Sequence, residues 1–266
     1  MKKRTDFSRD AQVLVALDST SDNRSAMRAA VALAARLRVQ LLGLFLEDTN
    51  LLRLADLPFA REIRPWSAQE RPLTEQDLLL SLRALAARTE MELGRMAGKA
   101  KVRWSFRVER GPRLQLLMNA GVTSDVLLVG EPRRSTKAGL SDSRRARRPS
   151  IVYLVYTGSP ASQRALITAA AMLEDQVGGL TMFVVAYKRK ELKRLHSEAS
   201  SRLDRQDVIP RMVDCLEEGG FPHFMSILTR LSGVALILPG DIEVPNDPLL
   251  FQRLLDQVGC PVVLVR

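Results

Sequence analysis

The sequence predicts an α/β protein made of two related, doubly wound parallel sheets of Rossmann-like type in one chain. Residues 13–47 (VLVALDSTSDNRSAMRAAVALAARLRVQLLGLFLE) align without a gap, at an offset of 139, with residues 152–186 (VYLVYTGSPASQRALITAAAMLEDQVGGLTMFVVA). Each segment reads as a strand, a polar turn, an Ala-rich amphipathic helix and a second strand. The 266 residues also suffice for two domains of about 100–150 residues each. We therefore expect an intramolecular pseudo-dimer with a first domain at 1–130, a basic linker at 131–150 and a shortened second domain at 151–266.

The first copy opens with an apolar strand of the kind that is buried on both faces of a parallel sheet. In the helix that follows, five residues recur at helical spacing and are expected to face the sheet, namely Ala26, Met27, Ala30, Ala34 and Leu37. Prolines then exclude a single helix after the second strand, and Thr74 with Asp77 predicts a capped helix start. The predicted elements are strand Gln12–Leu17, helix 24–38, strand 39–46, an irregular excursion 51–71, helix 74–97, strand 101–109, a short helix ending near Gly121 and strand 125–130.

The second copy repeats this order in shortened form. Its predicted elements are strand Ile151–Tyr156, helix 159–173, strand 180–186, a helical stretch 191–218 that Pro210 interrupts, a weak third strand 221–227, strand 234–238, helix 248–258 and strand 261–265. The first copy has no helix and fifth strand after DVLLVG. Either Ile151–Tyr156 serves only as the first strand of the second copy, or the first copy is incomplete.

Much of the net charge of +10 is concentrated in one segment. Residues 133–148 (RRSTKAGLSDSRRARR) hold seven Lys or Arg and one Asp. Such a segment is either a docking site for phosphate, nucleic acid or an acidic partner, or a solvated linker. Because no aromatic residue is interleaved to stack bases, non-specific nucleic-acid binding is only a third functional hypothesis.

Three segments resemble the universal stress protein family, in a tandem form. VLVALDSTSDNRSAMRAAVALA is similar to the family's first strand, terminal Asp and first helix, and LVYTGSPASQRALITAAAML is similar to the same region in a second copy. LLFQRLLDQVGCPVVLVR resembles the family's last helix and strand. The resemblance implies a stress-linked regulatory protein, and it spans most of the chain except 48–100 and 187–230, which match only in outline.

In the family's nucleotide-binding members, the resemblance implies that the Asp after the first strand contacts ribose or base. Here that residue is Asp18, which is equally well read as a helix N-cap. In an open parallel sheet, ligands bind beyond the carboxyl ends of the strands. The candidate ATP or AMP site is therefore placed at Asp18, Ser19, Thr20, Gly130 and Arg133.

The glycine-rich phosphate loop of those members is missing. Counted from Gly130, its glycines would fall at Arg133, Thr136 and Ala146, with its hydroxyl at Arg147. In the second copy, Thr157 stands where Asp18 would be, and Glu243 and Asn246 stand at the first loop positions. We therefore favour a non-catalytic regulatory protein that acts through protein contacts and holds no cofactor. An adenine-nucleotide sensor in the first domain is the main alternative.

No catalytic or metal-binding pattern is present in the sequence, so an enzyme is not expected. His196 and His223 are too scattered for a metal cluster, and Cys215 and Cys260 have no metal-type spacing. Cys260 is expected to be a buried structural thiol, and Glu47-Asp48 to end a strand in solvent.

Partner and location are also predicted. Apolar runs are too short to span a bilayer, and MKKRTDFSRD is not a signal peptide, so a cytoplasmic protein without membrane insertion is expected. The apolar strand Pro261 to Val265 is expected to pair with an equivalent edge, in a protein partner or a homo-oligomer, because a bare apolar edge favours aggregation.

Overall fold

The computed structural model describes residues 7, 10–21, 23–55, 57–63, 70–130, 151–173, 178–186, 188–204, 208–216, 225–228, 231 and 233–266. Within these residues, the first half contains β1 Gln12–Leu17, α1 Asn23–Leu37, β2 Gln40–Asp48, α2 Thr49–Ala55, β3 Arg61–Ile63, β4 Glu70–Pro72, α3 Glu75–Lys99, β5 Trp104–Gly111, α4 Arg113–Thr123 and β6 Val126–Val129. The second half contains β7 Ile151–Tyr156, α6 Pro160–Leu173, β8 Gly179–Ala186, α7 Arg189–Leu203, β9 Pro210–Leu216, β10 Ala235–Pro239, α9 Pro248–Gln257 and β11 Val262–Val265.

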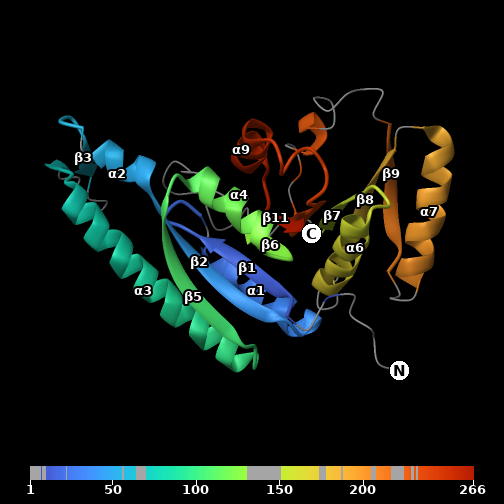
Figure 1. Ribbon diagram of the computed structural model, residues 1–266, viewed down its shortest axis with the longest axis horizontal. Coiled ribbons are helices and arrows are strands. Elements are labelled where there is room, and N and C mark those ends of the chain that lie inside the picture. Colours follow the sequence, from blue (N-terminus) through green and yellow to red (C-terminus); the bar gives the residue numbers. More distant parts are fainter. Residues whose placement is uncertain are drawn as a thin grey trace.

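Nine of these strands form one continuous sheet in the order β5-β2-β1-β6-β11-β10-β7-β8-β9 (Figure 1). Numbered within each half, the order is 3-2-1-4 in the first and 3-2-1-4-5 in the second. Within this sheet, pairing is parallel in each half and antiparallel only between β6 and β11, while β3 and β4 form a separate antiparallel pair. The predicted fold class and the duplication are confirmed.

Strand β11 joins the two halves. It pairs with β10 on one side and with β6 on the other, where Val263 lies opposite Leu128. Strand β7 pairs with β8 and β10, so it serves the second half alone, and the described part of the first half has no fifth strand of its own. The prediction that this strand pairs with an edge in another chain is therefore corrected, because both of its edges are occupied from within the chain.

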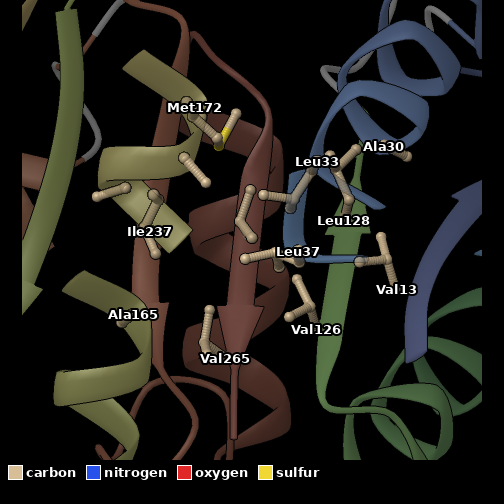
Figure 2. Close-up of a cluster of buried hydrophobic side chains, with 14 of the residues drawn as sticks. Val13, Ala30, Leu33, Leu37, Val126, Leu128, Ala165, Met172, Ile237 and Val265 are labelled. Carbon is tan, nitrogen blue, oxygen red and sulfur yellow. The ribbon is translucent and has the colours of Figure 1, made fainter. Parts of the chain in front are cut away.

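Each face of the sheet is covered by its own layer of helices. Helices α1, α3, α6 and α7 cover one face, and α4 and α9 cover the other. All five residues predicted to face the sheet from α1 are buried. The hydrophobic core beneath α1, α3, α6 and α7 is continuous across the junction between the halves. Figure 2 shows it, with Val13, Leu37 and Val126 from the first half and Met172 and Val265 from the second half.

Two predictions for the second half are wrong. Residues 210–216 form the edge strand β9 rather than the end of a helix, and residues 225–228 are helical rather than part of a strand. Pro210 is the first residue of β9, at the edge of the sheet, a position where a proline without an N–H is tolerated. Residues 221–224 of that predicted strand lie outside the described residues.

The predicted excursion after β2 is confirmed as a short helix and a two-stranded hairpin rather than one long helix. The next helix begins as predicted, since Thr74 Oγ1 accepts a hydrogen bond from the Asp77 amide at 3.1 Å. Across the described parts of the chain, no helix combines the length and apolar character needed to cross a membrane.

Candidate functional site

The candidate site lies where β1, β2 and β5 end at the same edge of the sheet. Asp18 follows β1, Glu47 and Asp48 end β2, and Arg110 lies near the end of β5. Helix α4 begins at the same edge with Arg113. The strands therefore bring three carboxylates and two guanidinium groups together.

Asp18 is buried and held by a tight turn. One carboxylate oxygen, Oδ1, accepts hydrogen bonds from the Thr20 amide at 2.7 Å and from the Thr20 hydroxyl at 2.9 Å. The backbone of Asp18 is bonded to the Asn23 side chain in both directions, at 3.2 and 2.8 Å. The side chain is thus fixed in the loop ahead of α1.

Arg113 closes the other side of the Asp18 carboxylate. Its Nε donates to Oδ2 at 2.8 Å, and the two side chains are only 15% and 6% exposed. Burial by itself raises the pKa of Asp18, but the positive charge of Arg113 and the hydrogen bonds from Arg113 and Thr20 outweigh it and hold the pKa below its ordinary value. Asp18 is therefore a permanent anion at neutral pH, with a cation of its own chain as partner.

Asp48 anchors the start of α4 on the same side of the sheet. Its Oδ1 accepts a hydrogen bond from the Arg113 amide at 3.3 Å and another from the Asn50 amide at 3.0 Å. The residue that precedes α4, Pro112, supplies no side-chain cap. A carboxylate from β2 thus takes the place of a cap and favours the helix N-terminus electrostatically.

The expectation that Glu47 ends its strand in solvent is wrong, because Glu47 is buried. Its side chain is 7% exposed, and its Oε2 accepts hydrogen bonds from Arg110 Nε at 2.9 Å and Nη2 at 2.8 Å. The expected alternation along β2 holds, because Asp48 lies toward α4 while Glu47 pairs with Arg110 on the adjacent strand. Burial of Glu47 is tolerated because the guanidinium neutralises it.

The predicted nucleotide-site residues are only partly brought together. Asp18 and Thr20 are in contact, Ser19 lies between them, and Gly130 is buried after β6. Arg133 and the rest of the basic linker, including Thr136, Ala146 and Arg147, lie outside the described residues. The predictions of nucleotide and nucleic-acid binding through that segment therefore stay predictions.

The two arginines that complete this site were not predicted from the sequence. Arg110 and Arg113 flank the turn Gly111-Pro112, in the segment RVERGPR at the end of the third strand of the first copy. The signal available was positional, since this turn follows a parallel strand and so lies at the same edge as Asp18. Every carboxylate of the site accepts hydrogen bonds from its own chain. These bonds fix the loop after β1 and the start of α4 in place.

The second half has a different structure at the corresponding strand end. Thr157 Oγ1 interacts with the Ser159 hydroxyl at 3.1 Å and with the Ser159 amide at 3.4 Å. Gly158 has φ of +80°, and a Cβ placed on it would lie 2.4 Å from Leu195 Cδ2 of α7. Leu195 of α7 therefore packs against Gly158 in the turn after β7.

The cysteine, tryptophan and histidine residues considered in the sequence analysis make packing or hydrogen-bond contacts where the structure describes them. Cys260 is buried, as expected, and Trp104 packs on α3, where a Cβ on Gly94 would lie 2.6 Å from its ring. His196 Nε2 lies 2.6 Å from Asp214 Oδ1 at an exposed position. Trp66 and His223 lie outside the described residues. Among the residues whose placement the structure gives, no three His, Cys, Asp or Glu side chains gather as a metal site would require.

Comparisons with known proteins are limited to structural similarity. No protein-family model matches the chain, and no curated protein matches it significantly. A universal stress protein structure from Archaeoglobus fulgidus is similar over 95% of this chain and 96% of its own, with 10% identity and a TM-score of 0.50. A structure from the universal stress protein family of Burkholderia pseudomallei covers 44% of this chain and 95% of its own, with 22% identity and a TM-score of 0.33. The likeness to the first of these shows that the chain has the universal stress protein fold.

Proposed function

We propose that this chain is a non-catalytic regulatory protein of universal stress type that acts through contacts with another protein. The observation that carries the proposal is the closure of the Asp18 carboxylate by Arg113 and Thr20. That carboxylate is buried and already accepts three hydrogen bonds from its own chain, so ribose hydroxyls would have to compete with these groups for it. The loss of the glycine-rich loop after Gly130 adds to this argument.

A surface suited to protein contacts lies beside the site-bearing sheet, at the excursion after β2. Three exposed apolar side chains fall within six residues there, namely Leu54, Leu57 and Phe59. Leu54 lies in the last turn of α2 and the other two follow this helix, which lies near the start of α3 in Figure 1. Apolar side chains gathered on a surface favour association with another protein, whereas most exposed positions of α3 are polar or charged.

Site-specific photo-crosslinking tests the protein-contact part of the proposal. A photoreactive phenylalanine analogue would replace Phe59, and a matched control would carry it at the exposed, polar position Glu90 of α3. We expect a discrete protein adduct from position 59 in stressed cells and none from position 90. No adduct at position 59, or the same adducts at both positions, would contradict the proposal.

An ATP turnover assay tests the non-catalytic part. We expect purified protein to release no more ADP than buffer does. Turnover that disappears in Asp18→Ala would show instead that the strand-end site is catalytic.

A further inference from the structure

A pocket of about 230 Å³ lies between the two halves, away from the Asp18 site. Met118, Gly121 and Val122 reach it from the last turns of α4, while Phe251 of α9 and Leu264 and Arg266 reach it from the second half. Arg113 and Val122 are at opposite ends of α4, separated by about 14 Å along the helix. The pocket therefore belongs to the junction and not to the strand-end site of the first half.

The pocket lies at the junction, where the described parts of the two halves differ. In the second half, α9 and β11 follow β10, but the described part of the first half has no helix or strand after β6. Within the described residues, α4 therefore meets α9 at the junction with no second helix equivalent to α9. Two glycines, Gly121 and Gly240, keep their parts of the wall free of side chains.

Apolar side chains form most of the pocket wall. Phe251 and Leu264 are almost completely buried, whereas Val122 is 60% exposed beside the opening. Pockets that take drug-sized molecules measure roughly 300–1,000 Å³, so this one fits a smaller molecule with a compact apolar body.

Arg266 supplies a positive charge to the same pocket. Its Nη1 donates to the Val122 carbonyl at 3.3 Å, at the last turn of α4. Its stem lies over Gly240, where a Cβ would come within 2.9 Å of Arg266 Cγ. Within the described residues no carboxylate forms an ion pair with Arg266, and its guanidinium has five N–H donors in a planar fork suited to a carboxylate.

We propose that the pocket between α4, α9 and β11 binds a small organic carboxylate whose compact apolar body lies against Phe251 and Leu264 and whose anion pairs with Arg266. Because it contacts both halves, such a ligand would stabilise their junction. The proposal is independent of the protein-contact function and of the closure at Asp18. The charge of Arg266 selects an anion, and the pocket walls select an apolar body.

A titration with phenylacetate tests this proposal directly. The full chain, with its methionine methyl groups labelled with ¹³C, would be titrated with phenylacetate and, separately, with neutral phenylacetamide. We expect a saturable shift of the Met118 methyl signal with phenylacetate and at least tenfold weaker binding of phenylacetamide. Arg266→Gln should weaken phenylacetate binding at least tenfold.

Two further variants separate pocket binding from general effects. Val122→Trp should block the opening and abolish the shift, whereas Met91→Trp, at an equally solvent-facing position of α3, should leave it unchanged. Melting temperatures of the four proteins show whether each remains folded. The proposal is overturned if Met118 does not respond to phenylacetate, if the amide binds as well as the acid, or if folded Arg266→Gln or Val122→Trp binds like wild type.

Discussion

The two halves close the same strand end with different chemistry. After β1, a buried ion pair between Asp18 and Arg113 holds the loop, and after β7 a Thr157–Ser159 turn is covered by Leu195. The stability of the loop after β1 depends on charge and on pH. The stability of the turn after β7 depends on packing and on a backbone conformation that favours glycine. The same strand order thus leaves the local chemistry of a strand end free to diverge.

Removal of one ion-pair partner is expected to have the largest effect. Arg113→Met leaves the Asp18 carboxylate buried without its cation, and breaking a buried pair in this way costs about 3–5 kcal/mol of unfolding free energy. Urea denaturation at neutral pH measures it. The double variant Asp18→Asn with Arg113→Met should recover much of the loss, and a double variant as unstable as Arg113→Met alone would show that the pair is not the cause.

The corresponding change in the second half should destabilise the protein through sterics. Gly158→Ala places a methyl group against Leu195 at a positive φ, so we expect a loss of about 1–3 kcal/mol. Gly98→Ala in α3 is the control, since a Cβ there meets nothing within 4 Å and the substitution favours the helix. Equal unfolding midpoints for Gly158→Ala and wild type would contradict the packing argument.

The more exposed ion pair of the first half should contribute less. Arg110 is 45% exposed, although its partner Glu47 is buried. We expect Arg110→Met to cost about 1 kcal/mol, because water can still reach the carboxylate through the space the guanidinium leaves. A loss as large as that of Arg113→Met would show that exposure does not distinguish the two pairs.

The smallest expected difference between the two halves is in how each contributes to the pH dependence of stability. The pKa of Asp18 is lower in the folded protein than its ordinary value of 3.8, so the unfolded chain takes up the proton first as the pH falls. The stability from this group is complete well above pH 3.8 and is lost as the pH falls from there through the lowered pKa.

Asp18→Asn should therefore flatten the acid limb of the unfolding free energy between neutral pH and about pH 2.5. Thr157→Val, at the equivalent position of the second half, should leave the shape of that limb unchanged. An acid limb that is the same in Asp18→Asn and wild type would contradict the assignment.

Local periodicity was enough to predict the framework. The bounds of β1 and β7, the buried face of α1 and the break after β2 follow from apolar spacing and proline positions. Strand β9 is not predicted by local pattern, because Pro210 is compatible both with a helix interruption and with the first residue of an edge strand.

The partners of the candidate site could not be predicted in the same way. Arg113 lies 95 residues after Asp18, and β2 separates β1 from β5 in the sheet. Their contact depends on α4 crossing over the sheet, which only the complete topology determines. Likewise, the sequence indicated an apolar last strand but not that β6 would occupy its second edge.

The most direct test of the account is native mass spectrometry of wild type and Asp18→Ala with ATP and with AMP up to 1 mM. Because Arg113 and Thr20 already occupy the Asp18 carboxylate, the account predicts that wild type carries no bound nucleotide beyond what Asp18→Ala carries. One equivalent of nucleotide bound by wild type and lost in Asp18→Ala would contradict it, and would show that the strand end opens to a ligand.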